Sequence, residues 1–551
     1  LTDDIVRPAL RFINSDGDWQ ETLMPAACEG IGIWRGRIPP GTQMVWICPA
    51  AREGRFQFRL EHVGSIGIAT RLRFVLSAPK RAFFAASARW VGLQAEADLN
   101  QRWMYGRAET QNYGRWRILR AKLDEAPQAA ANLAVLVLLK GSVAVEALIR
   151  SHASLVEQTH RNWRLCIVDP TPDEVAWLDG QADPRVIKDA ARALEEEIGI
   201  AAFLRTGDEM ARHALSCVAT HFEAHPEHNV VYTDELRVGA EGAVDPVFKP
   251  DWSPVRQAWA PYVGRAVFVR GQSPIATRGS IVSPEAVVEA VFARENIDSV
   301  GHIRRPLIVV GGGDEHKPVR HRAPSVALSG GAPKIGIVIP TRDRMDLLEP
   351  CLTSVLEKTS YRAFEIVVVD NDSSDPRTAE VLTRLSRKDS RLSVLPSPGP
   401  FNFSALCNRG AGIIDCAYLL FLNNDTEALD PEWLGNPLHF AAMPDIGAVG
   451  AKVLYPNATV QHAGVVLGMG GVAGHFGEGN EADAGGWLGG DNTPHEASAV
   501  TAACLMVARN KFDVVGGFDE VNLPVELSDV DLCLRLRQRG WRAICDCRTK
   551  L

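Results

Sequence analysis

The sequence predicts an α/β protein in which two similar copies of a mostly parallel, helix-covered sheet follow a small β-rich domain. Short apolar runs, such as residues 418–422, indicate strands buried on both faces of a parallel sheet. Helical patterns separate these runs, as in right-handed strand–helix–strand units. Residues 131–320 also resemble residues 333–551, with Asp169 and Asp370 at matching places. A period this long indicates a domain duplication.

Composition limits the class of protein. The chain has 551 residues, enough for roughly three or four domains. Its apolar fraction of 46% and charged fraction of 23% are ordinary for globular domains with buried cores. With 59 Lys and Arg against 67 Asp and Glu, the net charge is −8, which argues against a nucleic acid as partner.

The eleven cysteines include no pair with metal-site spacing. Cys545 and Cys547 lie two apart on a predicted strand, so they share one face and make poor ligands for one zinc ion. We interpret the cysteines as reduced core residues, which indicates the cytosol. No apolar run approaches the roughly 20 residues of a membrane span, and no signal peptide is recognisable. Because the chain starts at Leu1 without Met and stops at Leu551, we expect a fragment of a longer protein.

The parts before the first copy are predicted from local patterns. Residues 1–75 combine turns with alternating apolar positions, which indicates a small β-sandwich. Residues 76–130 have a helical pattern that ends in an Ala-rich stretch, so we expect a helical bridge and linker. Residues 311–333 are rich in Pro and Gly and indicate a linker between the copies.

In the second copy, three apolar strands are each followed by polar residues. The strand at 334–340 precedes Thr341, Arg342, Asp343 and Arg344, and a predicted helix follows at 345–358. The strand at 364–370 ends in Asp370 and leads into Asn371 and Asp372, whereas the strand at 418–422 precedes Asn423, Asn424, Asp425 and Thr426. Because the carboxyl ends of parallel strands meet at one sheet edge, we expect a polar crevice there that binds a nucleotide.

These residue types suit a nucleotide diphosphate. Arg342 or Arg344 can pair with phosphate oxygens, and Asp370 or Asn371 can bond a base edge or a ribose hydroxyl. Asp425 can hold a divalent cation that bridges the pyrophosphate. The alternatives are that these are turn residues, that the arginines are surface charges and that Asp370 caps a helix.

A further acidic pair, Asp529 and Asp531, lies in the first turn of an amphipathic helix that ends before Gly540. Negative charge there stabilises a helix by a few tenths to about 1 kcal/mol. Their spacing alone therefore does not mark either residue as a catalyst.

Six ordered motifs make residues 333–551 resemble the family 2 inverting glycosyltransferases of the GT-A fold, above all bacterial polysaccharide and rhamnosyl-type transferases. The motifs are VIPTRDR (338–344), VVVDNDSSD (367–375), GPFNFSALCNRGA (399–411), LFLNNDTEALDPEWL (420–434), VGAKVLYPNATVQHAGVVLG (449–468), and GGFDE (516–520) with SDVDLCLRLRQRGWR (528–542). The resemblance implies two tandem GT-A domains of nucleotide-diphospho-sugar transferase, Rossmann-like type, the second one truncated at its C-terminus.

The resemblance also implies roles for residues. Asp425 would bind Mg²⁺ or Mn²⁺ and the donor pyrophosphate, with Asn423 in place of a first carboxylate. Asp529 would be the catalytic base that deprotonates the acceptor hydroxyl, and Asp531 would support the helix. The implied donor-binding residues are Pro340, Thr341, Arg342, Arg344, Asp370, Asn371, Asp372, Asn423 and Asn424.

The Gly-rich stretch 464–490 is long for a loop without structure, and such loops are commonly lids or binding loops. We expect an acceptor-side flap that carries His462, His475 and Trp487. The alternative for His475 is a solvated loop residue.

The first copy resembles the same fold less completely. Its segments 232–238 (YTDELRV) and 245–254 (DPVFKPDWSP) match the family, but of the acidic cluster it keeps only Asp208. The acid-rich catalytic helix has no counterpart. We therefore expect a degenerate copy that is inactive or much weakened.

The resemblance implies an inverting transferase that moves a sugar from a UDP- or dTDP-sugar to a glycan or lipid-linked acceptor in surface polysaccharide synthesis. We expect a cytoplasmic protein and leave open a peripheral position at the cytosolic face of the inner membrane. Two alternatives remain open. One is a non-catalytic glycan- or nucleotide-binding scaffold, and the other is a bifunctional transferase in which both copies are active.

Overall fold

The computed structural model describes most of the chain from residue 133 onward. The described ranges are 133–140, 144–188, 198–238, 244–271, 297–311, 331–468 and 473–551, with residue 193 and shorter stretches within 9–90 and 276–281. The chain divides into two compact units, residues 1–130 with 237–246, and residues 131–236 with 247–551. Within the described parts, no helix combines the length and the apolar character that crossing a membrane requires.

The N-terminal unit contains an antiparallel sheet of order β2-β1-β3. A helix, α2, follows within the predicted helical bridge. The rest of the predicted sandwich and bridge lies outside the described residues, as does most of the predicted linker at 311–333. The elements are β1 (Ala9–Asn14), β2 (Trp19–Leu23), β3 (Thr42–Cys48) and α2 (Pro79–Trp90).

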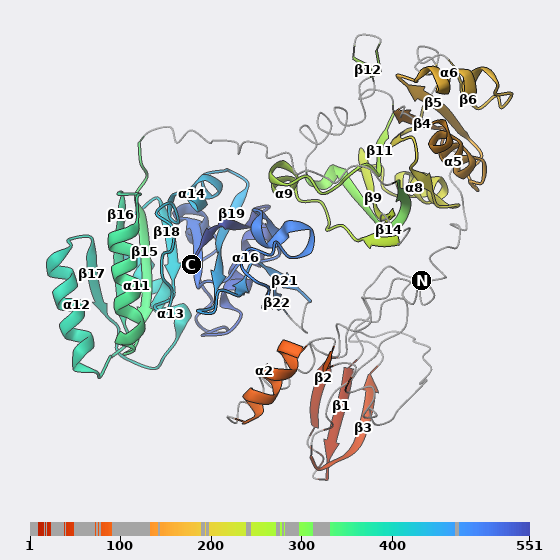
Figure 1. Cartoon of the computed structure of the whole chain (residues 1–551). Helices are drawn as coiled ribbons and strands as arrows, with labels where there is room; N and C mark the ends of the chain where they lie inside the picture. The colour runs from red at the N-terminus through yellow and green to blue at the C-terminus, as the bar shows by residue number, and fades with distance from the viewer. Residues whose placement is uncertain are drawn as a thin grey trace. The chain divides into compact units, whose positions relative to one another are not determined.

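The second copy is built on a mixed sheet of order β17-β16-β15-β18-β24-β19-β25-β23, and Figure 1 labels the first four of these strands. The first four strands in this order run parallel, and β24 pairs antiparallel with both β18 and β19. The strands are β15 (Ile335–Thr341), β16 (Phe364–Asp370), β17 (Leu392–Pro396), β18 (Tyr418–Leu422), β19 (Ile446–Leu454), β20 (Val460–His462), β23 (His495–Ala497), β24 (Cys504–Ala508) and β25 (Arg542–Lys550).

Both faces of this sheet are buried. Successive strand residues point to opposite sides, so each strand contributes side chains to two clusters. Ile337 and Ile339 pack in one cluster with residues of α11, α12 and α14, whereas Val338 packs in another with residues of α13, α15 and α16. The fully apolar strands predicted from the sequence follow from this double burial. The helices are α11 (Met345–Lys358), α12 (Pro376–Lys388), α13 (Phe403–Ile413), α14 (Gly435–Ala441), α15 (Arg509–Val514) and α16 (Ser528–Gln538).

The first copy has a sheet of order β6-β5-β4-β7-β11-β9-β14-β8, whose first five positions repeat the directions of the second sheet. Its strands are β4 (Val135–Lys140), β5 (Trp163–Val168), β6 (Val186–Ile187), β7 (Ile200–Arg205), β8 (Glu209–Met210), β9 (Val230–Val238), β10 (Val244–Val247), β11 (Val267–Arg270) and β14 (Val300–Val310). A separate hairpin consists of β12 (Ala276–Thr277) and β13 (Ser280–Ile281).

Helices cover one face of the first sheet, where Val137 and Leu139 pack with residues of α5, α6 and α8. On the other face Leu136 and Leu138 lie in a cluster with Trp252 and Tyr262, from the segment around α9. The helices are α5 (Val145–Val156), α6 (Pro172–Asp179), α8 (Ala214–Ala224), α9 (Pro254–Trp259) and the short η2 (Ile297–Ser299).

Most of the described cysteines are core residues. The nine whose side chains the structure describes form no disulfide, and eight of them are buried. Cys545 and Cys547 lie on one face of β25, with their sulfur atoms 3.7 Å apart.

Candidate active site

The carboxyl ends of β15 and β18 open into a cavity of about 440 Å³. It brings together eight of the residues singled out from the sequence, and its whole lining comes from five segments of the chain. The lining residues are Pro340, Thr341, Arg342, Arg344, Phe401, Phe403, Asn423, Asn424, Asp425, Thr501, Ala502, Ala503, Val525, Ser528 and Asp529. A cavity at the carboxyl ends of parallel strands is where the sequence predicts a ligand.

The turn after β18 holds Asp425 toward solvent. Thr426 is buried, and its hydroxyl donates to the carbonyl oxygen of Asn423 at 2.8 Å, which closes the turn. Asn424 Nδ2 donates to Thr341 Oγ1 at 2.9 Å and so ties this turn to the end of β15. Asp425 itself is exposed. The segment is therefore both a turn and part of a cavity wall, and the two interpretations of the sequence are compatible.

Asp529 enters the cavity wall from the first turn of α16. Its Oδ2 accepts a hydrogen bond from the backbone N–H of Ala502 at 3.0 Å, and its Oδ1 accepts one from that of Val530 at 2.8 Å. These two bonds fix the direction of the carboxylate, and each oxygen keeps a second lone pair. Asp531 instead forms an ion pair with Arg535 at 2.6 Å, one helical turn along. Of the two aspartates, only Asp529 lines the cavity.

Asp370 is the last residue of β16, Asn371 and Asp372 follow it, and none of the three lines the cavity. The backbone N–H of Ser373 donates to Asp370 Oδ1 at 3.1 Å, so this carboxylate organises the turn that follows it. Asn371 is buried, and its Nδ2 donates to the carbonyl oxygens of Ser397 and Gly399. Asp372 is exposed, with a φ of 61°. The helix cap considered for Asp370 is instead provided by Asp375, which caps α12.

Sequence reasoning assigned no role to several residues of this region. Phe401 and Phe403 line the cavity, and they stand in the GPFNF part of a quoted motif, where two aromatic residues near a predicted polar crevice were the available signal. Asp343 accepts hydrogen bonds from the backbone N–H groups of Ser374 and Asp375, which lower the pKa of its carboxyl group. It thereby joins the loops that follow β15 and β16.

The histidines predicted for the acceptor side form a pair. His462 Nδ1 and His475 Nδ1 lie 2.8 Å apart, and His462 is buried. The backbone N–H groups of Gly464 and Thr501 both face His462 Nε2, at 3.2 and 3.5 Å. We therefore assign the proton to His462 Nδ1, which donates to His475. Burial and the neighbouring histidines keep the pKa of His462 well below its usual range, so the ring stays neutral.

The Gly-rich stretch 464–490 is not structureless. It contains the hairpin of β21 (Val465–Leu467) and β22 (Ala473–His475) and the start of η3 (Trp487–Asn492). Trp487 is 45% exposed, and its carbonyl oxygen accepts a hydrogen bond from Arg256. His462 belongs to β20, and Thr501, whose N–H faces it, also lines the cavity. The predicted acceptor residues therefore lie on ordered segments, one of which is tied to the cavity wall.

In the first copy, Asp208 is the third residue after β7, as Asp425 is the third after β18. Asp208 is 1% exposed. It accepts hydrogen bonds from the backbone N–H groups of Arg205 and Gly311, and it lies 3.4 Å from the guanidinium of Arg265. Burial raises the pKa of this carboxyl group despite the cation. The carboxylate is enclosed by its own domain and does not face solvent.

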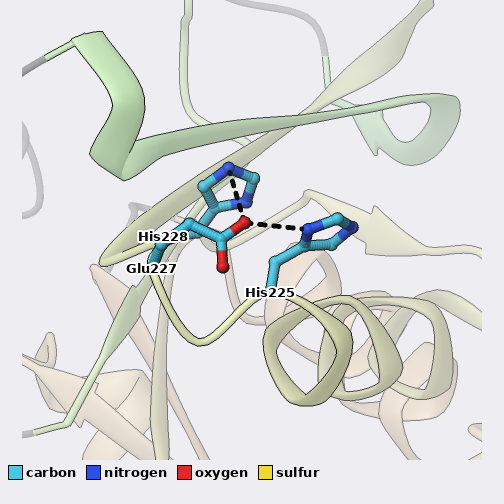
Figure 2. Close-up of side chains that lie close together, drawn as sticks. All are labelled: His225, Glu227 and His228. Atoms are coloured by element: carbon cyan, nitrogen blue, oxygen red, sulfur yellow. Dashed lines mark hydrogen bonds and ion pairs between the residues drawn. The ribbon is translucent and has the colours of Figure 1, made fainter.

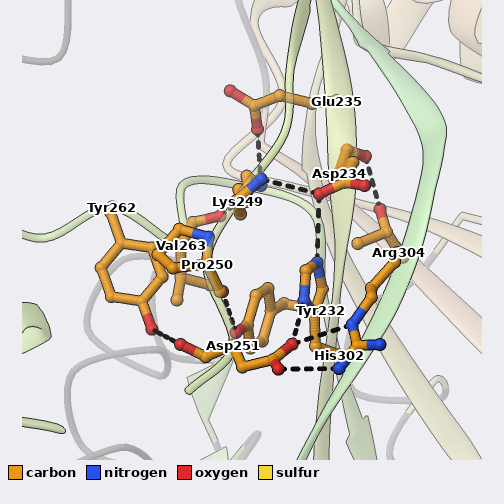
Figure 3. Close-up of polar contacts among 11 residues, drawn as sticks. Tyr232, Asp234, Glu235, Lys249, Pro250, Asp251, Tyr262, Val263, His302 and Arg304 are labelled. Carbon is orange, nitrogen blue, oxygen red and sulfur yellow. Dashed lines mark hydrogen bonds and ion pairs between the residues drawn. The ribbon is translucent and has the colours of Figure 1, made fainter. Parts of the chain in front are cut away.

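The motif residues of the first copy bind one another (Figure 3). Glu235 and Lys249 form a buried ion pair at 2.8 Å. His302 lies between Asp234 and Asp251, at 3.1 Å from each. These contacts join the YTDELRV and FKPDWSP segments to β14, so the matching motifs serve the internal structure of this copy.

A larger cavity, of about 700 Å³, lies elsewhere in the second copy and is lined by residues that include Arg509, Gly516 and Arg535. Arg509 follows the end of β24, which is antiparallel to β18, so this cavity lies at the opposite edge of the sheet from Asp425. It contains no residue of the predicted site.

The sequence model described as glycosyl transferase family 2 matches residues 336–474. The second copy belongs to glycosyl transferase family 2. The match includes β15, β18 and the turn that carries Asp425. Membership of this family and the mixed α/β sheet together support the GT-A fold for the family 2 domain.

The similarity of the chain to its relatives extends beyond the family 2 domain. The chain is 34% identical over 504 residues to the O-antigen biosynthesis protein RfbC of Myxococcus xanthus, which covers 80% of this chain and 39% of that protein. It is 30% identical over 455 residues to the uncharacterized protein y4gI of Sinorhizobium fredii, covering 72% of this chain and 50% of that protein. The chain thus spans half or less of the length of these relatives.

Among solved structures, the chain is similar to the mannosyltransferase PcManGT from Pyrobaculum calidifontis, in complex with GDP-Man and Mn²⁺. The identity is 17%, the match covers 40% of this chain and 56% of that one, and the TM-score is 0.31.

Proposed function

We propose that the family 2 domain is an inverting glycosyltransferase that moves a sugar from a UDP- or dTDP-sugar to a glycan or lipid-linked acceptor during surface polysaccharide synthesis. The observation that carries the proposal is the cavity that brings Asp425 and Asp529 together. One carboxylate suits the metal-bound diphosphate and the other suits the acceptor hydroxyl. The similarity to an O-antigen biosynthesis protein supports the polysaccharide pathway.

The residues present fit a divalent cation. Asp425 is exposed, and the amides of Asn423 and Asn424 line the same cavity. Carboxylate and amide oxygens are ligands that Mg²⁺ and Mn²⁺ accept, usually with substrate phosphates completing the shell. Such an ion, when bound, supplies positive charge that stabilises the departing diphosphate.

The arginines of the cavity can supply further positive charge. Arg344 forms an exposed ion pair with Asp346 at 3.0 Å, with side chains 61% and 65% exposed. Exposed pairs contribute little free energy, so this guanidinium can turn to a phosphate at small cost. Arg342 lines the same cavity and is also exposed. We propose that both arginines hold the diphosphate, while Asp370, Asn371 and Asp372 shape the neighbouring turn on the donor side.

In the proposed reaction, Asp529 takes the proton of the acceptor hydroxyl as its oxygen attacks the anomeric carbon. The bond between that carbon and the diphosphate oxygen breaks, and the bonding electrons leave with the diphosphate. The N–H groups of Ala502 and Val530 hold the carboxylate in one orientation, which general base catalysis requires. His462, His475 and Trp487 are proposed to contact the acceptor.

We propose that the first copy is a duplicated, non-catalytic GT-A-like domain. The enclosed Asp208 and the internally paired motif residues support this. The protein is proposed to work at the cytosolic side, which the absence of disulfides among the described cysteines supports.

The test compares Asp529→Asn with the matched control Asp531→Asn, which changes the same residue type in the same helical turn. Asp529→Asn should lower kcat by about 10²- to 10⁴-fold and leave donor binding unchanged. Asp531→Asn should keep turnover within a few-fold. Wild-type turnover in Asp529→Asn would contradict the proposed base. A wild-type protein with neither turnover nor donor binding, in a screen of nucleotide sugars with Mg²⁺ or Mn²⁺, would contradict the proposed transferase, and binding without turnover would favour a scaffold.

A further inference from the structure

A cluster of histidines and one glutamate lies in the first copy, where α8 ends and β9 begins. Figure 2 shows His225, Glu227 and His228 converging from one short turn. His225 Nδ1 lies 3.0 Å from Glu227 Oε1, and His228 Nε2 lies 3.9 Å from the same oxygen. All three ligand atoms lie within 4.8 Å of one another. The turn is outside the family 2 domain, and no step of the proposed reaction uses it.

The spacing suits a single ion. Zinc binds imidazole nitrogen and carboxylate oxygen at about 2.0–2.2 Å, so neighbouring ligands of a tetrahedral site lie about 3.3 Å apart. The atoms of the cluster, within 4.8 Å of one another, bracket this value. Small side-chain rotations are enough to reach one ion. The exposed positions of His225 and Glu227 leave the fourth position of such a site to solvent.

A third histidine, His221, orients His228. His221 Nε2 lies 2.9 Å from His228 Nδ1, and the two rings are stacked. A metal-binding histidine is usually held in this way through its other ring nitrogen. A Cβ on Gly301 would lie 2.5 Å from His228 Nδ1 and 2.6 Å from His221 Nε2. Glycine at this position therefore leaves the room that the histidine pair needs.

Hydrogen bonds from one arginine also fix the backbone of the turn. Arg270 donates from Nη2 to the carbonyl oxygens of Phe222 and His225, at 2.8 and 3.0 Å, and from Nε to that of His228, at 3.0 Å. One guanidinium thus fixes the backbone on both sides of Glu227. A turn ordered before binding loses less conformational entropy when it takes a ligand.

We propose that His225, Glu227 and His228 bind one divalent transition-metal ion of the zinc type. Two imidazoles and a carboxylate suit Zn²⁺ and its neighbours in the transition series, whereas Mg²⁺ prefers oxygen ligands throughout. This site and the proposed donor site therefore differ in the metal they select. The ion joins the end of α8 to the start of β9, so its binding stabilises the first copy.

The test uses the full chain, freed of metal with a chelator and titrated with Zn²⁺ in excess Mg²⁺. Wild type should retain one equivalent of zinc, and its thermal midpoint should rise by about 5 °C or more at zinc concentrations well above Kd. His225→Ala and Glu227→Gln, which change exposed side chains, should both lose this equivalent and the shift. His439→Ala, at an exposed histidine of α14, and Asp425→Asn should keep both.

Cobalt in place of zinc reports the ligand type. The proposed site gives weak visible absorption without a thiolate-to-cobalt charge-transfer band. A thiolate band that persists in His225→Ala would place the ion at Cys545 and Cys547 and overturn the proposal. Retention of the zinc equivalent by both His225→Ala and Glu227→Gln would also overturn it.

Discussion

Asp208 and Arg265 face each other at 3.4 Å inside the first copy, at the strand end where the second copy exposes Asp425. Both aspartates follow an apolar strand by three residues. In one copy the carboxylate is enclosed by a cation and two backbone N–H groups, and in the other it lines a cavity. The aspartate at this position of the sheet is thus enclosed by protein groups in the first copy and open to a cavity in the second.

Exchanging each of these aspartates for asparagine should separate stability from activity. Asp208→Asn leaves the partly buried Arg265 without its anionic partner, so it should lower the free energy of unfolding of the first copy by about 1–3 kcal/mol. Turnover should not change. Asp425→Asn should lower turnover. It should leave the free energy of unfolding nearly unchanged, because the carboxylate of Asp425 is exposed. Urea unfolding and sugar transfer measure the two effects. Loss of one of two products in Asp208→Asn would instead show that both copies are active.

The amide of Asn423 stands where the resemblance implies a second carboxylate, in the wall of the same cavity as Asp425. Asn423→Asp adds one negative charge near the proposed ion. At an exposed site, a divalent ion about 4 Å from an added charge gains on the order of 2 kcal/mol, so the apparent Kd for Mn²⁺ should fall by about thirtyfold. Calorimetric titration of Mn²⁺ in the presence of donor measures it. An unchanged or weaker Kd would place position 423 outside the metal site.

Much of the second copy follows from its sequence because its strands are buried on both faces. The apolar runs at 364–370 and 418–422 and the helix at 345–358 coincide with β16, β18 and α11. The cavity at the strand ends follows from the same reasoning, since parallel strands bring their carboxyl ends together. Asp425 and Arg342 therefore line a cavity that could be anticipated.

Side-chain partners could not be anticipated in the same way. Asp370 ends one buried strand and Asp425 follows another, but only the structure shows that Asp370 accepts a hydrogen bond from Ser373 and that Asp425 is exposed. Ala502 holds Asp529 through its backbone N–H, a contact that leaves no signature in residue type. The zinc-type cluster depends on His221 and Gly301, which are distant in sequence and adjacent in space.

The pair of aspartates around His302 makes the stability of the first copy depend on pH. Burial lowers the pKa of His302, but hydrogen bonds to Asp234 and Asp251 outweigh it and raise the pKa above the usual value. The imidazolium therefore contributes stability that is complete below about pH 6.5 and is lost as the pH rises through the folded-state pKa. A nearby cation, Arg304, pairs with Asp251 at 2.7 Å.

His302→Gln should accordingly cost more stability at pH 6 than at pH 9. Urea unfolding of wild type and variant at both pH values gives the two differences in free energy. A difference of the same size at both values would mean that His302 is neutral throughout and acts only through packing against Tyr232.

The hydrogen bond between Asn424 and Thr341 should control donor affinity more than fold. Thr341 is 2% exposed, and its hydroxyl accepts the bond from Asn424 Nδ2 at 2.9 Å beside Asp425. Thr341→Val keeps the shape but removes this acceptor, at a cost of about 1 kcal/mol, so the Kd for donor should rise about fivefold. Thr341→Ser retains the hydroxyl and should bind donor as wild type does. Donor titration of the three proteins decides the matter, because wild-type affinity in Thr341→Val, or an equal loss in Thr341→Ser, would mean that the hydrogen bond does not set the geometry of the turn.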